Sequence, residues 1–322
     1  MYDNVWILAE QRAQGAWHPS AFELIAAART LAPTVHAVTW GDADADFAVL
    51  GEYGVSAVHR IDIGDQLPAM PVSAAFAPAC ATGAELILAA TSYDGRDILA
   101  RLSARLDRTL LSNAIGLVMD GSQLVVRHAI FGGTTIVEAC FDGPPPHLVL
   151  VRPKSFVPEP IGGSAPIVDL LDTVASDVSA RIISSFAEPR SGPVLDEAQV
   201  VVAGGRGLGS VESFDLVEKL AALLHGAPAA SRAVVDAGWV PYAYQVGQTG
   251  ATVKPVVYIA CGISGATQHI VGMKGAQHIV AINKDPDAPI FAIADLGVVG
   301  DVAQVLPRLI SALQARESQL QT

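Results

Sequence analysis

The first half of the sequence alternates short apolar runs with segments in which apolar residues recur every three or four positions. Residues 4–10 predict a buried strand, and residues 20–31 follow with helical spacing and Ser20 as the expected N-cap. Residues 35–40 predict the next strand. Because strand and helix alternate, the pattern favours a parallel, helix-covered sheet, that is, an α/β domain.

The same pattern continues to about residue 153. Residues 94–110 place Leu99, Leu102 and Leu106 on one helical face. Further strands are expected at residues 84–92, 128–141 and 147–153.

Proline, glycine and serine then cluster at residues 153–166 and again at 188–193. Two segments between the clusters, 167–174 and 180–186, predict short edge strands. Such clusters are typical of linkers, so we expect a domain boundary near Ser191, with domains at 1–190 and 191–322. We further hypothesise that this linker lets the second domain move.

The second half restarts the alternation of strand and helix. Residues 212–226 predict a helix with Phe214, Val217, Ala221 and Leu224 on one face and Gly226 as its stop. Buried strands are expected at residues 198–205, 255–261, 278–283 and 289–294. A second parallel α/β domain of Rossmann-like character is therefore predicted.

Residues 301–316 predict a closing helix with Asp301 as its N-cap. Pro307 conflicts with a straight helix, so we expect a kink or a late start there. The apolar stripe of this helix consists of Val302, Val305, Leu306, Leu309, Ile310 and Leu313.

Composition and charge exclude several classes of protein. Apolar residues make up 51% of the 322 residues, and the net charge is −12 without any basic stripe, which disfavours nucleic-acid binding. No apolar run is long enough to insert into a membrane, and the N-terminus does not resemble a signal peptide, so we expect a cytoplasmic protein or a trimmed mitochondrial form. Three scattered cysteines disfavour a disulfide framework, a zinc site or an iron–sulfur cluster.

A glycine-rich stretch at residues 201–210 follows the first strand of the second domain. Its glycines let the backbone approach a ligand where a helix starts, a position that favours phosphate. Ser210 stands where a dinucleotide fingerprint has its third glycine, so a plain strand–helix turn is equally compatible with the pattern. Arg206 within the glycines favours an anion site.

Two further glycine-hinged segments suit ligand binding. Residues 245–250 offer the amide of Gln248 and the hydroxyl of Thr249, although the same segment also fits a surface turn. Residues 262–269 repeat the strand–glycine–helix layout and place His269 early in a helix, where it contacts a ligand or simply packs.

The end of the strand at 278–283 lies where ligands bind in open α/β sheets. Asp285 or Asp301 fits a hydrogen bond to a ribose, and each fits a helix cap as well. No nucleophile–base pair is recognisable, and Cys261 reads as a buried strand residue. The sequence therefore favours a cofactor holder over an acid–base enzyme.

Ordered motifs between residues 200 and 306 resemble the alpha subunits of electron transfer flavoproteins. They include "VVAGGRGLGS", "QVGQTG", "GISGATQH" and "AINKDPDAPIF". "TSYDGRDILARLSARL", "FGGTTIVEA" and "VRPKSF" extend a looser similarity through the first half. The chain departs from the family pattern at Ala251, Thr267 and Leu296, and none of these departures removes a proposed contact to the flavin ring.

This resemblance implies an electron carrier rather than an enzyme with its own substrate. The alpha subunit would hold FAD in its C-terminal domain, paired with a beta subunit that holds AMP. It would pass electrons from flavin dehydrogenases to a quinone oxidoreductase or a similar acceptor, through an anionic semiquinone. Two alternatives are an electron-bifurcating flavoprotein with a second FAD in the beta subunit and a non-redox nucleotide-binding interaction protein. A nicotinamide-dependent oxidoreductase is disfavoured by the interrupted glycine fingerprint.

The resemblance also implies the residues of the FAD site. Arg232, Thr249 and His269 would lie against the flavin ring, with Arg232 and His269 stabilising negative charge on the reduced ring. The region around Ser264 would face the pyrophosphate, and Asn283 and Asp301 the adenosine end. The full set is Arg206, Ser231, Arg232, Val246, Gly247, Gln248, Thr249, Ser264, Gly265, Ala266, Thr267, Gln268, His269, Asn283, Asp301 and Val302.

Overall fold

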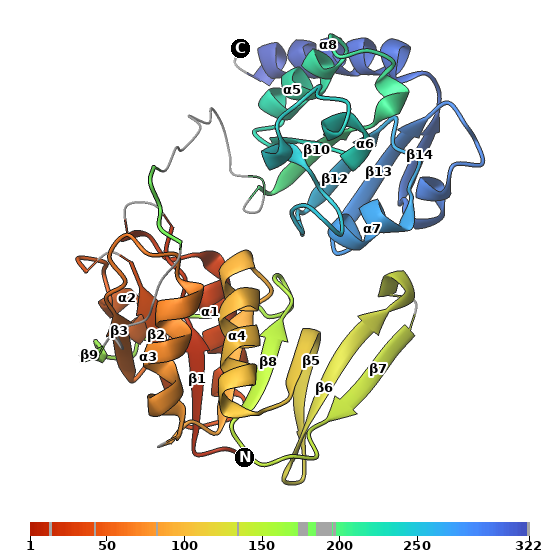
Figure 1. Cartoon of the computed structure of the whole chain (residues 1–322). Helices are drawn as coiled ribbons and strands as arrows, with labels where there is room; N and C mark the ends of the chain where they lie inside the picture. The colour runs from red at the N-terminus through yellow and green to blue at the C-terminus, as the bar shows by residue number, and fades with distance from the viewer. Residues whose placement is uncertain are drawn as a thin grey trace. The chain divides into compact units, whose positions relative to one another are not determined.

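The computed structural model describes residues 1–12, 15–41, 43–81, 83–133, 135–172, 180–184, 195 and 198–320. The chain divides into two compact units, Met1–Ala187 and Glu188–Thr322, both visible in Figure 1. The boundary expected near Ser191 and its linker lie outside the described residues. The division into two α/β units agrees with the predicted fold class.

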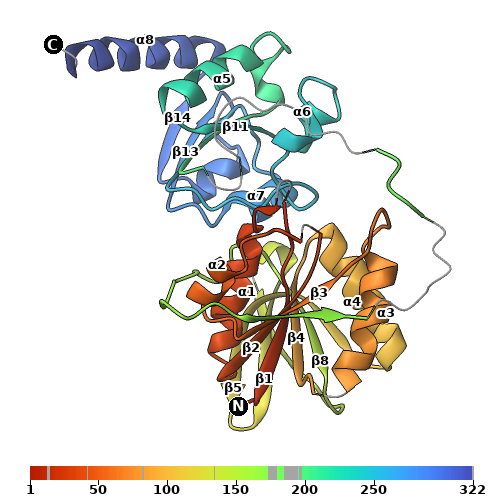
Figure 2. The ribbon, with the colours of Figure 1, turned by 90° about the vertical axis from the view of Figure 1, so that its left-hand side faces the viewer.

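The first unit is built on a mixed sheet with the strand order β7-β6-β5-β8-β4-β1-β2-β3-β9 among its described residues. Its strands are β1 (Asn4–Leu8), β2 (Thr34–Trp40), β3 (Ala57–Ile61), β4 (Leu86–Ala90), β5 (Leu110–Asp120), β6 (Gln123–Ile130), β7 (Thr135–Cys140), β8 (His147–Val151) and β9 (Ile167–Leu171). Its helices are α1 (Pro19–Arg29), α2 (Ala48–Glu52), α3 (Ala69–Ala81) and α4 (Tyr93–Leu106). Helices α1 and α2 cover one face of this sheet, and α3 and α4 cover the other (Figure 2).

An antiparallel extension interrupts the expected parallel sheet. The segment 128–141, predicted as one strand, is two strands: β6 and β7 pair antiparallel and are joined by a short 3-10 turn, η2 (Phe131–Gly133). Strand β5 also pairs antiparallel with β6, while β5 and β8 are parallel. The glycines at this turn separate two apolar runs that the sequence pattern had merged.

Segment 167–174 contains β9, which pairs with β3 at the edge of the sheet as predicted. Within 180–186, Arg181 forms only a single bridge with Gln66, and residues 185 and 186 lie outside the described part.

Helix starts in the first unit depend on residues outside the apolar pattern. Helix α1 begins at Pro19, so its N-cap is His18 rather than Ser20, and His18 Nδ1 accepts the Ser20 N–H. Proline suits the first helical position because its φ is preset and its missing N–H would have had no partner there. Helix α4 has Ser92 as its N-cap and buries Leu99 and Leu102, as expected.

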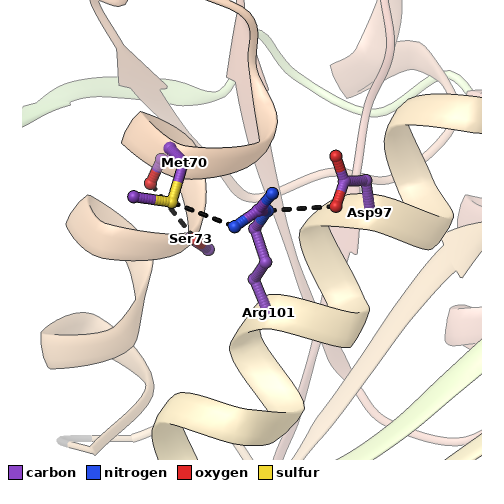
Figure 3. A network of polar contacts seen from close by, with 4 residues as sticks. All are labelled: Met70, Ser73, Asp97 and Arg101. Carbon is purple, nitrogen blue, oxygen red and sulfur yellow. Dashed lines mark hydrogen bonds and ion pairs between the residues drawn. The ribbon is translucent and has the colours of Figure 1, made fainter. Parts of the chain in front are cut away.

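Helices α3 and α4 are linked by Arg101 (Figure 3). Its Nε lies 3.0 Å from Asp97 Oδ1 on the preceding turn of α4, and its Nη1 lies 3.1 Å from Met70 Sδ on α3. Arg101 and Asp97 are both exposed, so this pair contributes about 0.5 kcal/mol to stability.

The second unit is a parallel sheet with the order β11-β10-β12-β13-β14. Its strands are β10 (Val200–Gly204), β11 (Ala227–Ala230), β12 (Val257–Cys261), β13 (His278–Asn283) and β14 (Leu296–Val299). Its helices are α5 (Phe214–Leu223), α6 (Arg232–Val235), α7 (Thr267–Met273) and α8 (Val302–Leu320), with 3-10 turns η3 (Arg206–Leu208), η4 (Tyr242–Tyr244) and η5 (Pro289–Ile293). Helices α5 and α8 pack on one face, and α7 and η5 on the other.

Two segments of the second unit differ from the sequence prediction. Residues 289–294 form η5 instead of a strand, because Pro289 starts a tight turn that buries Ile290, and the strand follows as β14. At the end of α5 the left-handed position is taken by His225, with a φ of 50°, whereas Gly226 donates its N–H to the Ala221 carbonyl.

Helix α8 starts at Val302 and continues through Pro307, so a late start is wrong. Asp301 caps it as predicted, since its Oδ1 accepts the Ala303 N–H at 2.9 Å. No helix among the described residues is long and apolar enough to cross a membrane.

Candidate functional site

The predicted site residues gather at one edge of the second sheet. The five parallel strands end in register, with Gly204 opposite both Ala230 and Cys261, and Asn283 opposite Val299. Every candidate residue lies at or just after one of these carboxyl ends, or in the 245–250 loop, which the Val246 N–H joins to the Ala230 carbonyl at 3.0 Å. Strand β11 pairs on one side of β10, whereas β12, β13 and β14 follow on the other side. The strand order therefore reverses between β10 and β12, and ligands bind at such a reversal in open α/β sheets.

The glycines at this reversal let two turns pack backbone to backbone. Gly205 donates to the Cys261 carbonyl at 2.9 Å, and Gly207 donates to the Gly262 carbonyl at 3.0 Å. A Cβ on Gly205 would lie 2.3 Å from the Gly262 oxygen. These glycines therefore have a structural role, while the Arg206 side chain between them is exposed and free to meet an anion from solvent.

The loop 245–250 is held against the start of α7. Gln248 donates its N–H to the Gln268 carbonyl at 2.7 Å, and a Cβ on Gly247 would lie 2.8 Å from that same carbonyl oxygen. The buried Gln245 donates from Nε2 to Thr249 Oγ1 at 3.0 Å, and Tyr242 donates to the Thr249 carbonyl. The bond between Gln248 and Gln268 brings the two predicted glycine-hinged segments, 245–250 and 262–269, together. The Gln248 and Thr249 side chains remain exposed.

His269 is the buried polar centre of this region, with only 7% of its surface exposed. Its Nε2 lies 2.9 Å from the Tyr258 hydroxyl. Burial lowers the pKa of His269 to about 4, and a hydrogen bond with the Val246 backbone raises it only in part. His269 is thus a neutral imidazole held inside the second unit by Tyr258 and the Val246 backbone.

This burial predicts a specific loss of stability in acid. Between pH 6.5 and about 4 the unfolded chain takes up a proton on this histidine and the folded chain does not, so stability is full above pH 6.5 and falls as pH drops through this window. The expected loss is about 3 kcal/mol. The difference in unfolding free energy between the wild-type chain and His269→Asn, measured from pH 7 to pH 4, should shrink by this amount. A difference that stays constant would show that burial does not suppress protonation.

Ser231 and Arg232 follow strand β11 directly. Ser231 donates its N–H to the Gly204 carbonyl at 2.9 Å and stands at the N-cap of α6 without a side-chain cap bond. Arg232 Nε lies 3.2 Å from Asp236 Oδ2, and the two side chains are 67% and 62% exposed. Such an exposed pair contributes little to stability, so the guanidinium is held at this edge but still accessible.

The remaining candidates divide into exposed and structural residues. Ser264, Ala266, Thr267 and Gln268 are exposed, whereas Gly265 is buried with a φ of 86°. Val246 and Val302 are buried in the core, so only their backbone atoms are available to a ligand.

Asn283 and the aspartates have protein partners of their own. The Asn283 amide donates to the Ile263 carbonyl at 2.9 Å and its Oδ1 accepts the Asp285 N–H at 3.0 Å. Asp301 caps α8, and Asp285 Oδ1 accepts the Asp287 N–H at 3.0 Å. Of the two roles expected for Asp301, a helix cap or a hydrogen bond to a ribose, its contacts in the structure are those of a helix cap. Asn283 connects the turn at Ile263 with the turn at Asp285.

Sequence reasoning missed Gln245 and Tyr258, which hold Thr249 and His269. Tyr258 lies in an apolar run that reads simply as a buried strand. A signal was present, however, because a tyrosine hydroxyl inside a fully buried strand needs a hydrogen-bond partner.

Comparison with known proteins identifies the family. Residues 5–174 match the electron transfer flavoprotein domain, and residues 194–274 match the electron transfer flavoprotein FAD-binding domain. The chain is 37% identical to the electron transfer flavoprotein subunit alpha of Thermoanaerobacterium thermosaccharolyticum, covering 97% of this chain and 98% of that protein. The chain belongs to the electron transfer flavoprotein alpha-subunit family.

Two further relatives are similar to this chain along nearly their whole length. The electron transfer flavoprotein subunit alpha of Mycobacterium tuberculosis is 43% identical, over 98% of this chain and 99% of that protein. The protein FixB of Clostridium saccharobutylicum is 36% identical, over 98% of this chain and 97% of that protein. The second unit therefore contains the FAD-binding domain of an electron-carrying flavoprotein, and the matched residues include Arg206, Arg232, Thr249 and His269.

Proposed function

We propose that the carboxyl edge of the second sheet holds FAD, and that this chain works as the alpha subunit of a heterodimer with an electron transfer flavoprotein beta subunit. The observation that carries the proposal is that the three glycine-hinged segments meet at this edge, with the exposed guanidinium groups of Arg206 and Arg232 beside them.

The residues at this edge fit FAD in charge and in hydrogen bonding. Arg206 is an exposed guanidinium suited to the pyrophosphate, and Arg232 is one suited to a flavin ring that becomes negative on reduction. Thr249 offers a hydroxyl oriented by Gln245. Asn283 and Asp301 are already bonded, so their contribution at the adenosine end would come from backbone groups or from lone pairs not yet used.

FAD supplies the redox chemistry, since it accepts two electrons and releases them singly. The chain binds and orients it and stabilises negative charge on the reduced ring. In the finer form of the proposal, electrons come from flavin dehydrogenases and pass to a quinone oxidoreductase or a similar acceptor. The one-electron-reduced flavin is then held in its anionic form, and the beta subunit carries AMP.

Cofactor analysis of the heterodimer tests this function. This chain, co-expressed with its beta subunit and purified, should release one FAD and one AMP per heterodimer on denaturation, measured by chromatography. Two FAD and no AMP would instead support the electron-bifurcating alternative. A complex that holds nucleotide but neither contains nor takes up FAD would overturn the proposal and favour a non-redox nucleotide-binding protein.

A further inference from the structure

Two half-buried histidines lie side by side on neighbouring strands of the first unit. His36 is on β2 and His59 is on β3, and His36 Nδ1 lies 2.9 Å from His59 Nε2. The two ring planes differ by 4°, with centroids 5.2 Å apart, so a hydrogen bond joins the rings edge to edge. The buried indole of Trp6 on β1 lies nearly parallel to both rings, with its centroid 4.9 Å from that of His36 and 4.5 Å from that of His59.

An acidic side chain lies on the other side of this pair, on the edge strand β9. Asp169 is opposite His59 in the register of β3 and β9. Ile61 and Leu171, each two residues further along its strand, both pack in the core on the face covered by α3 and α4. Because side chains alternate between the faces of a strand, Asp169 shares this face with His59.

The other elements around the pair bring no further charge to it. No Asp, Glu, Lys or Arg occurs along β1, β2 or α3. Helix α3 contributes the Cys80 thiol, which stays neutral because burial raises its pKa. Arg60 follows His59 on β3 and therefore points to the opposite face. Helix α4 packs over β4, β5 and β8 instead.

The pair can bind one extra proton but not two. In the neutral pair, the N–H of one ring donates to the lone pair of the other. One added proton goes to an outer ring nitrogen and leaves this hydrogen bond intact. A second would set two N–H groups against each other across 2.9 Å and place two positive charges side by side.

The neighbouring charges select His59 as the residue that carries this proton. Burial lowers the pKa of both histidines, and a charge on His59 lowers the pKa of His36 further. Asp169 offsets part of the effect of burial on the pKa of His59. A charged His59 would donate from Nε2 to His36 Nδ1 and lie against the face of Trp6, which attracts a cation.

We propose that His36, His59 and Asp169 form a one-proton switch that strengthens the attachment of the edge strand β9 to the first sheet in acid. Asp169 gains an ionic partner across the boundary between β3 and β9 when His59 is charged, and loses it when His59 is neutral. The switch lies in the first unit and does not depend on FAD.

Strand β9 is an element on which one ion pair has a measurable effect. It ends the strand order of the sheet, beside β3, and four of its five residues are exposed (Figure 1). Strands with few buried contacts open at a low cost in free energy, so a contact worth less than about 1 kcal/mol changes how often they open.

The order of protonation is tested by NMR of ¹⁵N-labelled histidine across a pH titration of the heterodimer. The two signals are assigned by their absence in His36→Gln and in His59→Gln. His59 should become charged first, while His36 stays neutral, and Asp169→Asn should lower the proton affinity of His59 about threefold. The proposal would be overturned if His36 became charged first, if both became charged together, or if His59 stayed neutral until acid unfolded the protein.

Amide hydrogen exchange of β9 tests the structural effect. Wild-type protein and Asp169→Asn are compared about one pH unit below the midpoint measured for His59, and again near pH ~8, where the pair is neutral. Exchange in β9 should be about threefold faster in Asp169→Asn in acid and equal in the two proteins near pH ~8. In a His59→Gln background the substitution at Asp169 should have no effect at either pH. Equal effects of Asp169→Asn at both pH values, or none in acid, would contradict the proposal.

Asp120→Asn is the matched control, because it removes one exposed carboxylate from the same sheet. Asp120 ends β5, which β8, β4, β1 and β2 separate from β3. This variant should leave the exchange of β9 unchanged in both conditions. If it accelerated β9 in acid as much as Asp169→Asn, the effect would come from the overall charge of the protein, and the switch would be excluded.

Discussion

Replacing Arg232 by glutamate is expected to make reduction of the bound FAD about 100-fold less favourable. The wild-type guanidinium is exposed at the carboxyl edge of the sheet, and its Nε lies 3.2 Å from Asp236 Oδ2. Reversing its charge changes the interaction with a reduced, negative flavin by about 2–3 kcal/mol at the effective dielectric of a protein surface. The reduction potential of the FAD, measured in the heterodimer at low and high salt, should therefore fall, and less so at high salt.

Arg101 provides a matched control for this variant. Like Arg232, it is an exposed arginine that pairs with an aspartate four residues away along the chain, but it lies in the first unit. Arg101→Glu should cost a similar, small amount of stability, within about 1 kcal/mol, and leave the FAD potential unchanged. If both variants shift the potential equally, Arg232 acts only through the overall charge of the protein and has no place against the flavin.

Replacing Gly265 by alanine is expected to destabilise the second unit by about 3–5 kcal/mol and to release FAD. The φ of Gly265 is +86°, and a Cβ there would lie 2.3 Å from the Ile290 nitrogen. Ile290 is fully buried and donates its N–H to the Ser264 carbonyl at 3.0 Å, so η5 cannot move away without breaking this contact. The large cost combines a strained φ with a backbone clash. The denaturation midpoint, followed by the fluorescence of released flavin, measures it.

Gly209→Ala separates the two contributions. Gly209 has nearly the same φ, +87°, but nothing lies within 4 Å of a Cβ at that position. It should lose only about 1–2 kcal/mol, from backbone strain alone. Similar losses in the two variants would mean that the close approach of Ile290 does not matter and that Gly265 is retained only for its φ.

Much of the fold was readable from the sequence because buried parallel strands leave continuous apolar runs. Strands β10, β12 and β13 follow that rule. The pattern failed where an apolar run had another explanation. Residues 289–294 form a 3-10 turn in which Ile290 packs against Gly265, and residues 128–141 form two strands of a hairpin.

The glycines in the sequence were enough to locate the candidate site, but they did not predict the contacts within it. Spacing indicated that residues 201–210 and 262–269 follow strands, and parallel topology then brings them to one edge. That Gly205 is opposed by Gly262, and that the Asn283 amide is used by Ile263, depends on tertiary packing that spacing does not encode. The partnership of Tyr258 with His269 likewise required the structure.

Stepwise reduction of the heterodimer, followed by visible absorption, tests most directly whether this edge holds an electron-carrying FAD. The expected result is a red, anionic, one-electron-reduced flavin that accumulates midway in the wild type, and accumulates less in Arg232→Glu because the negative ring loses its nearby positive charge. A colourless complex that takes up no added FAD, or a flavin spectrum that does not respond to changes at Arg232 and His269, would contradict the placement of FAD at this edge.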